Sequence, residues 1–263
     1  MFRVMSFNIR GAFHDDGENE WDKRRALNIA TIKKYNPDII GFQEVQEGNI
    51  VDYKAALTEY EYELGFISIR KTEQYHQIPI FWNPSRFEKL DTGGFYLSET
   101  PHKWSLGWDS TLIRAVTWVK LRDFQNDIEF IVLNTHYPHE RDTDTTRANC
   151  STLIIEQLAK IAPNLPQIVT ADFNAHPTSH AYKLFIDHDY VDSYIVAGET
   201  QDYNTFHGFQ GDAYEWQVGR IDWILTKDSN KQLISKSAQV IFDAKPPIYP
   251  SDHYPILAEL DFM

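Results

Sequence analysis

The segment QIVTADFNAHP, residues 167–177, is a strand-like run that passes directly into polar residues. Its first part is rich in β-branched side chains, which favour strands, and the polar residues from Asp172 onward end the run. Folds often place reactive groups at strand ends, because the strand fixes the position of a side chain while the loop leaves it accessible. The segment therefore predicts a strand that carries a candidate functional carboxylate, Asp172, at its end.

Similar runs, rich in Val, Ile, Phe, Tyr, Trp and Thr, recur along the whole chain. Each run ends in a polar cluster, which is the pattern of a strand followed by a turn or loop. Together they predict strands at 2–9, 38–43, 78–83, 115–121, 128–135, 167–172, 220–226, 238–242 and 254–260.

Three segments between these strands have the residue spacing of helices. The clearest begins after Asp144 and ends at Pro163, and two others cover about 22–35 and 51–60. The expected inner faces are Ala148, Thr152, Ile155, Leu158 and Ala159 in the first of these helices, and Ala26, Ile29, Ala30 and either Ile32 or Lys33 in the second. Because helices and strands alternate irregularly and no Gly/Ser-rich or Pro-rich linker appears, we expect an α+β fold in a single domain, residues 1–263.

Bulk composition is that of an ordinary globular protein, with 42% hydrophobic and 24% charged residues among 263. The 25 basic and 38 acidic residues give a net charge of −13, which repels polyphosphate backbones and anionic lipid unless a local basic patch overrides it. Long duplex nucleic acid is therefore a disfavoured partner, and the sequence indicates no protein partner. A small basic cluster on the first helix is expected to be a solvated face; its members are Lys23, Arg24, Arg25, Lys33 and Lys34.

Cysteine usage and the N-terminal sequence favour a cytoplasmic protein. Cys150 is the only cysteine, which excludes an internal disulfide and a thiolate metal site. The first residues, MFRVMSFNIR, lack the long apolar core of a signal peptide, and no apolar run approaches the ~20 residues that span a bilayer. We therefore expect no membrane span and a cytoplasmic location.

Polar residues of a few types stand at the ends of the predicted strands. Each of them alone is an ordinary turn or loop residue. As a set, the carboxylates and amides are hard oxygen donors that suit Mg²⁺ or Mn²⁺, and histidine with aspartate adds a proton-handling pair near neutral pH. They predict a site in which a metal polarises a phosphoryl oxygen and a carboxylate aligns a water. The set comprises Asn8, Glu44, His136, Asp172, Asn174, Asp222, Asp252 and His253.

Six segments of the chain occur in the order typical of one superfamily: SFNIR at 6–10, PDIIGFQEV at 37–45, LNTHYPHE at 133–140, VTADFNAHP at 169–177, GRIDWIL at 219–225 and PSDHYPI at 250–256. In this ordered set the chain resembles the endonuclease/exonuclease/phosphatase superfamily, which includes pancreatic deoxyribonuclease, and within it the compact bacterial members. The resemblance implies a four-layer α/β/β/α sandwich of two packed, mainly antiparallel β-sheets flanked by helices. It also implies a divalent-metal-dependent phosphoesterase activity.

The same resemblance implies roles for the metal and the water. Glu44 would bind Mg²⁺ or Mn²⁺, with Asn8 and Asp252 nearby. Asp172 would orient or deprotonate the attacking water, and Asn174 would hold that carboxylate and hydrogen-bond the phosphoryl oxygens.

Further residues are implied to contact the phosphate. His253 would donate to a nonbridging oxygen, Asp222 would fix the tautomer of that histidine, and His136 would approach the same phosphate from the other side. Arg114 and Arg147 are expected to add positive charge for substrate binding if they face the cleft.

The chain departs from the superfamily pattern at two positions. Abasic-site enzymes carry a carboxylate two residues after the first-strand Asn, and here that position is Arg10, which argues against DNA repair. Several nucleases carry a Glu just before the strand predicted at 78–83, and here that position is His76, with Glu73 three residues earlier. A carboxylate partner for His136 is therefore left open.

The sequence leaves three functions open. A phosphoesterase that acts on a small phosphodiester or phosphomonoester is favoured by the net charge, and an endonuclease or exonuclease is the alternative within the same chemistry. A non-catalytic protein that binds phosphate or carbohydrate is the third, although all the expected catalytic residues are present. Zinc bound by His136 and His139 is disfavoured, because Pro138 lies between them and no His-Glu-x-x-His helix motif occurs.

Overall fold

The computed structural model describes residues 1–66, 76–140 and 143–263, and in this part of the chain the strands form two six-stranded sheets. The first sheet has the spatial order β11 (Leu233–Val240), β12 (Ile256–Phe262), β1 (Phe2–Asn8), β2 (Ile39–Gln43), β4 (Ile80–Trp82) and β3 (Glu61–Glu63). The second has the order β5 (Phe87–Tyr96), β6 (Ala115–Asp123), β7 (Ile128–His136), β8 (Gln167–Asp172), β10 (Asp222–Lys227) and β9 (Val191–Asp192). The pairs β1–β2 and β7–β8 are parallel, and the other strand pairs are antiparallel.

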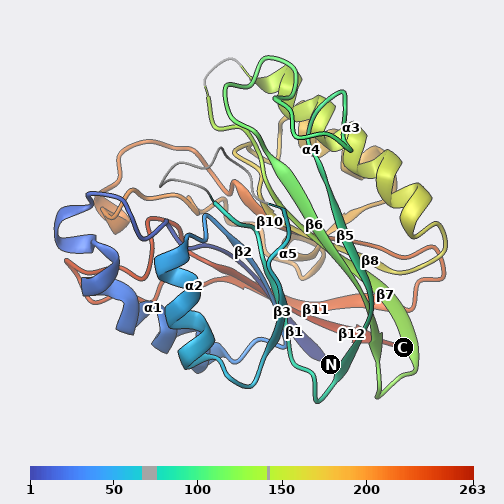
Figure 1. Cartoon of the computed structure of the whole chain (residues 1–263), viewed down its shortest axis with the longest axis horizontal. Coiled ribbons are helices and arrows are strands. Elements are labelled where there is room, and N and C mark those ends of the chain that lie inside the picture. Colours follow the sequence, from blue (N-terminus) through green and yellow to red (C-terminus); the bar gives the residue numbers. More distant parts are fainter. Residues whose placement is uncertain (67–75, 141–142) are drawn as a thin grey trace.

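Helices cover the outer face of each sheet (Figure 1). The helices α1 (Trp21–Tyr35) and α2 (Glu47–Ala56) pack on the first sheet, and α3 (Asp144–Ile161) and α4 (His180–Asp187) pack on the second. A single-turn helix, α5 (Ser193–Val196), follows β9. The expected four-layer sandwich of mainly antiparallel sheets is thus confirmed. None of the helices in the described ranges combines the length and apolarity needed to cross a bilayer.

The inner faces of the central strands change from apolar to polar toward one end of the sandwich. At one end the layer between the sheets is apolar and includes Phe2, Val4, Phe130 and Ile168. Further along the same strands the inward positions are Ser6 and Asn8 in β1, Asn134 and His136 in β7, and Thr170 and Asp172 in β8. A strand places every second side chain on the same face, so one face of each strand serves both the core and the polar end.

The polar end is held by hydrogen bonds that cross from one sheet to the other. Gln43 Nε2 in β2 donates to Asn134 Oδ1 in β7 at 2.7 Å, and Asn134 Nδ2 donates to the backbone oxygen of Phe42 at 2.7 Å. Gly41 lies at this crossing, where an added Cβ would lie 2.0 Å from Thr170 Oγ1 and 2.8 Å from Asn134 Oδ1. The sheets therefore approach here more closely than a side chain at position 41 would permit.

The sequence patterns missed three strands, β3, β5 and β9, and the helices α4 and α5. All three missed strands lie at the edges of their sheets, where a strand is stabilised by pairing on one side and exposes much of its surface. The predicted strand at 238–242 is also an edge strand, and β11 in fact covers 233–240. The helix expected at 51–60 begins earlier, at Glu47.

The expected buried faces of two helices were partly wrong. In α1, Ala26 and Ala30 are exposed, whereas polar Asn28 and Thr31 are buried. In α3, Thr152 and Ala159 are exposed in the same way. Alanine and threonine are small enough to be tolerated on either face, so they indicate a helical face poorly.

Arg24 corrects the expectation of a solvated basic face on α1. The other four basic residues of the cluster are exposed, but Arg24 is fully buried. Its guanidinium donates to backbone oxygens of Ile9, Asn19 and Pro250 at 2.7–2.9 Å, and also to that of Arg10. Arg24 therefore joins the end of β1 to the segment that precedes β12.

Substitution of Gly41 by alanine tests the close approach of the sheets. We expect Gly41→Ala to lower the free energy of unfolding by about 1–3 kcal/mol, because the new methyl group overpacks the crossing. Thr170→Ala alone should cost about 1 kcal/mol through its lost hydrogen bonds. In the double variant the nearest clashing atom is gone, so its loss should be smaller than the sum of the two single losses. Urea unfolding of the four proteins measures this, and strictly additive losses would contradict the proposed clash.

Candidate active site

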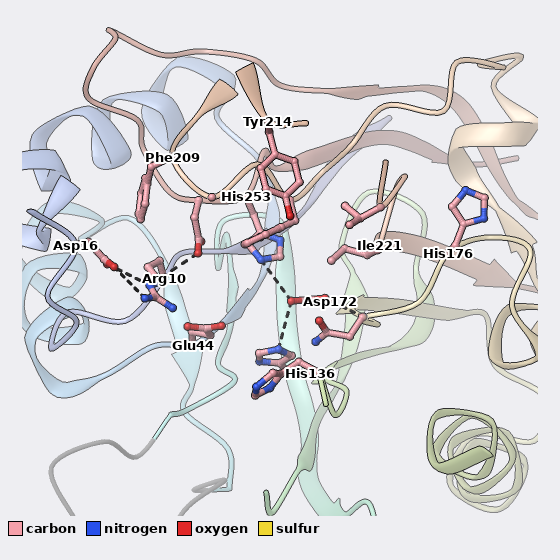
Figure 2. Close-up of a pocket in the computed structure, with 16 residues that line it drawn as sticks. Arg10, Asp16, Glu44, His136, Asp172, His176, Phe209, Tyr214, Ile221 and His253 are labelled. Atoms are coloured by element: carbon pink, nitrogen blue, oxygen red, sulfur yellow. Dashed lines mark hydrogen bonds and ion pairs between the residues drawn. The ribbon is translucent and has the colours of Figure 1, made fainter. Parts of the chain in front are cut away.

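A pocket of about 710 Å³ opens at the polar end of the two sheets (Figure 2). Strand ends supply its floor, which includes Glu44, His136 and Asp172, and in Figure 2 Phe209 and Tyr214 lie across the pocket from these residues. The full lining consists of Arg10, Asp16, Glu44, His136, His139, Asp172, Asn174, His176, Phe206, Gly208, Phe209, Tyr214, Val218, Ile221, Asp252 and His253.

The strand register brings three of the expected residues together. His136 ends β7 opposite Asp172 of β8, and Asp172 pairs in turn with Asp222 at the start of β10. His253, which lies three residues before β12, is held beside this group by an isolated backbone bridge to Phe206. A carboxylate oxygen of Asp172, one of Asp222 and a ring nitrogen of His253 all lie within 4.8 Å of one another.

Asp172 is the centre of this cluster. Its Oδ2 accepts a hydrogen bond from Asn8 Nδ2 at 2.9 Å and lies 3.3 Å from His136 Nε2 and 3.7 Å from His253 Nε2. Its Oδ1 accepts from the backbone N–H of Asn174 at 2.9 Å. Burial alone would raise the pKa of Asp172, but the two imidazoles and the hydrogen bonds outweigh it and hold the pKa well below its ordinary value. Asp172 is therefore an ionised carboxylate, suited to orienting a water.

The two histidines beside Asp172 have partners of opposite charge. Nδ1 of His253 lies 3.0 Å from Asp222 Oδ2, whereas Nδ1 of His136 lies 3.0 Å from Nη1 of Arg114. An ionised carboxylate can only accept a hydrogen bond, so Nδ1 of His253 carries a proton that it donates to Asp222. A guanidinium can only donate a hydrogen bond, so Nδ1 of His136 offers a lone pair to Arg114. His136 therefore carries its proton on Nε2, which points toward Asp172, whereas Nε2 of His253 points the same way and is protonated only when the ring is an imidazolium.

Their protonation states differ for the same reason. Burial lowers the pKa of His253, but the carboxylates of Asp222 and Asp172 outweigh it and raise the pKa above its ordinary value. Burial also lowers the pKa of His136, and Arg114 lowers it further against the opposing charge of Asp172. At neutral pH His253 is therefore an imidazolium and His136 a neutral imidazole. The partner of His136, left open by the sequence, is the arginine Arg114.

The oxygen donors expected to hold a metal lie at the same end of the sheets. Glu44 follows β2, Asn8 ends β1, and their side chains are joined by a hydrogen bond from Asn8 Nδ2 to Glu44 Oε1 at 3.1 Å. Burial raises the pKa of Asp252. The charge of His253 lowers this pKa and the charge of Glu44 raises it, and the net result is a pKa above the ordinary value. Asp252 is buried and Glu44 is half-buried. Two such carboxylates that disfavour each other's charge, beside an amide, are a donor set that a divalent cation would stabilise. The residues present thus fit a hard divalent metal.

Four non-glycine residues of the pocket lining have left-handed backbone conformations. The φ angles are 52° for Arg10, 63° for Glu44, 47° for Asn174 and 60° for Phe209. Such conformations cost about 1–3 kcal/mol each unless the surroundings determine them, and they are concentrated at functional sites. At Asn174 the cause is visible, because its N–H bonds Asp172 and its side-chain amide donates to the backbone oxygen of Tyr137 at 3.1 Å.

Neither Arg114 nor Arg147 is among the described residues that line the pocket. Arg114 is buried behind His136 and bonds His136 and His139. Arg147, on α3, donates to the backbone oxygens of Pro138 and Glu140 and so braces the segment after β7. Their expected role in substrate binding depended on their facing the cleft, and this condition is not met among the described lining residues. Glu73 lies outside the described residues.

The arginine that does line the pocket is Arg10, which the sequence marked only as a departure. Its guanidinium pairs with Asp16 at 2.9 Å and lies 3.8 Å from Asp252. The aromatic wall formed by Phe206, Phe209 and Tyr214 was also missed. It comes from an irregular segment without strand or helix periodicity, and the only indication in the sequence is its density of aromatic residues and glycines.

Two solved structures of bacterial proteins are similar to this chain over its whole length. The chain is similar to an endonuclease/exonuclease/phosphatase from Bacteroides vulgatus, with 31% identity, a TM-score of 0.87 and coverage of 100% of this chain and 99% of the other. It is also similar to the mannosyl-6-phosphatase of Bacteroides thetaiotaomicron, with 28% identity, a TM-score of 0.87 and full coverage of both chains.

Sequence comparison agrees with the structural likeness. An uncharacterized protein of Acanthamoeba polyphaga mimivirus is 26% identical over 183 residues, which span 65% of this chain and 66% of the viral protein. The chain thus matches slightly less than two thirds of that relative's length. The model of the Endonuclease/Exonuclease/phosphatase family matches residues 5–253, which include all the residues of the pocket floor. Because the family model matches nearly the whole chain, including the strand ends that form the pocket, this chain belongs to the Endonuclease/Exonuclease/phosphatase family.

Proposed function

We propose that this protein is a divalent-metal-dependent phosphoesterase that hydrolyses small phosphoesters by in-line attack of water. Members of the family are generally phosphoesterases that depend on a divalent metal. The observation that carries the proposal is the position of Asp172, an ionised carboxylate on the pocket floor with two imidazole Nε2 atoms within 3.7 Å. An anionic water-orienting group beside two hydrogen-bond donors is the arrangement that phosphoryl transfer requires.

The residues divide the work between water and phosphate. A divalent cation held by Glu44, Asp252 and Asn8 would supply Lewis acidity to a phosphoryl oxygen. Asp172 accepts a hydrogen bond from the attacking water and aims its oxygen at phosphorus. The imidazolium of His253 donates from Nε2 to a nonbridging oxygen, where its charge offsets the negative charge of the transition state.

His136 contributes a hydrogen bond without adding charge. Because Arg114 occupies its Nδ1, the proton stays on Nε2, and this N–H can donate to a second phosphoryl oxygen. The neutral state also leaves Asp172 only one full imidazolium neighbour, so its carboxylate remains available to the water. Arg114 is in this scheme a positioning residue that acts through His136.

Substrate size follows from charge and from the walls of the pocket. The net charge of −13 disfavours duplex DNA, whose binding depends on many lysine and arginine contacts to phosphates. Arg10, the arginine in the lining, is already paired with Asp16. Phe206, Phe209 and Tyr214 offer aromatic faces suited to a ring beside the phosphate. The likeness to a mannosyl-6-phosphatase supports a phosphorylated sugar or similar metabolite as the substrate class.

Loss of the Asp172 charge should abolish most of the activity. We expect Asp172→Asn to lower kcat by about 10²–10⁴ with Mg²⁺ or Mn²⁺ present, because the amide no longer accepts from the attacking water as a carboxylate does. Asp127→Asn is the matched control, since Asp127 is exposed and its φ of 53° suits asparagine. Activity on bis(nitrophenyl) phosphate should also disappear after chelation and return with metal. Near wild-type turnover of a folded Asp172→Asn protein, or turnover unaffected by chelation, would contradict the proposal.

Removal of the Arg114 guanidinium should change the pH profile as well as the rate. We expect Arg114→Met to lower kcat by about 10–100-fold, the usual effect of losing a group that orients a catalytic histidine. Arg114 lowers the pKa of His136, so in the variant this pKa rises and the acidic limb of the profile moves to higher pH. Arg114→Lys keeps a positive donor and should restore part of both properties. An unchanged acidic limb in Arg114→Met would show that Arg114 has only a structural role.

The substrate class can be ranked at a single salt concentration. At about 0.15 M salt, the physiological ionic strength, we expect kcat/KM on sugar phosphates or small phosphodiesters to exceed that on plasmid or duplex DNA by a wide margin. Side-by-side assays with the same metal provide the comparison. Efficient degradation of duplex DNA, with the small esters left untouched, would favour the nuclease alternative.

A further inference from the structure

A second group of potential metal ligands lies beside the oxygen donors and shares only Glu44 with the scheme above. It consists of His14, in the segment between β1 and α1, Glu44 after β2, and His76 before β4. The backbones of Val45 and Gln77 form an isolated antiparallel bridge, with N–H···O distances of 3.1 and 2.7 Å. In this antiparallel register Glu44 and His76 occupy diagonal positions on the same face of the pair, a spacing that side chains can bridge.

The distances within this group suit a single bound ion. One ligand atom from each of the three side chains lies within 4.8 Å of the other two. Nε2 of His14 lies 3.9 Å from Oε2 of Glu44, and the rings of His14 and His76 have centroids 5.8 Å apart. Opposed ligands with bonds of about 2.1 Å would lie roughly 4.2 Å apart, so small side-chain rotations would bring all three atoms onto one ion.

An ordinary hydrogen bond does not explain the arrangement of His14 and Glu44. The 3.9 Å between His14 and Glu44 exceeds hydrogen-bond distance, and within the described residues the buried Nε2 of His14 has no hydrogen-bond partner. Glu44 uses Oε1 to accept from Asn8, which leaves Oε2 directed toward His14. A buried imidazole nitrogen and a carboxylate oxygen thus face each other with room for an atom between them.

A neutral imidazole nitrogen and an ionised carboxylate are the forms of these side chains that bind metals.

We propose that His14, Glu44 and His76 form a binding site for a transition-metal dication such as Co²⁺ or Zn²⁺, adjacent to the oxygen-donor site of Asn8, Glu44 and Asp252. Two imidazole nitrogens with one carboxylate suit these ions, whereas Mg²⁺ prefers oxygen ligands throughout. Glu44 is shared between the two sites, through Oε1 on the side of Asn8 and Oε2 on the side of His14. The inference concerns binding and does not depend on the reaction proposed above.

Binding of Co²⁺ without substrate tests this site. The protein is stripped with chelator and titrated with Co²⁺ in excess Mg²⁺, which occupies the oxygen-donor site, and binding is followed by visible absorption and calorimetry. We expect His14→Ala and His76→Ala each to weaken Co²⁺ binding by at least ~10-fold. His102→Ala, which removes an exposed histidine elsewhere, is the matched control and should leave binding unchanged.

A second measurement needs only the wild-type protein. Proton NMR of its Co²⁺ form should show strongly shifted imidazole N–H signals from two histidines, a signature that surface binding to scattered residues does not produce. Wild-type protein without these signals, or with Co²⁺ affinity equal to that of both histidine variants, would overturn the proposed site. Because no substrate is present, this outcome is independent of whether Asp172→Asn abolishes phosphoester hydrolysis.

Discussion

The close approach of the two sheets at Gly41 is the constraint on which the candidate active site depends. The cross-sheet hydrogen bonds of Asn134 hold the polar end together, and they form only because position 41 carries no side chain. The same proximity lets Asn8 of one sheet donate to Asp172 of the other at 2.9 Å. Buried polar groups are stable only when they are paired, so the hydrogen bonds that assemble the site also offset the cost of placing it inside the sandwich.

The chemistry of the site comes from unequal partners for two similar histidines. Asp222 holds a proton on Nδ1 of His253, and Arg114 excludes one from Nδ1 of His136, although both histidines direct Nε2 toward Asp172. Environments that push the pKa values of neighbouring groups apart assign different roles to them. In the proposed mechanism one imidazole supplies charge and the other only a directed hydrogen bond, which limits the positive charge around Asp172, the carboxylate proposed to accept from water.

Sequence alone predicted the buried part of the structure far better than its edges. A central strand such as β8 is marked by its own apolar run and by the polar residue at its end, so the strand and Asp172 could both be identified. An edge strand such as β5 depends on its neighbour for stability, and its exposed, glycine-containing sequence carries no comparable pattern. The partner of His136 could not be found in this way, because Arg114 is 22 residues distant in the chain and β6 and β7 must pair before the two side chains meet. Arg24 was misplaced for a similar reason, since its backbone-oxygen partners belong to segments far from α1.

The floor and the walls of the pocket have different origins, and this difference bears on substrate choice. The floor is made by strand ends, whose positions are fixed by sheet pairing, whereas the wall containing Phe206, Phe209 and Tyr214 is an irregular segment. Rigid elements suit groups that must be placed accurately for reaction, and loops can change the shape of the entrance without moving those groups. Because Asp16 already neutralises Arg10 at this entrance, the walls add aromatic surface and little net positive charge. These walls therefore support the proposed substrate class, a compact phosphoester with a ring next to its phosphate, over the many phosphates of a duplex.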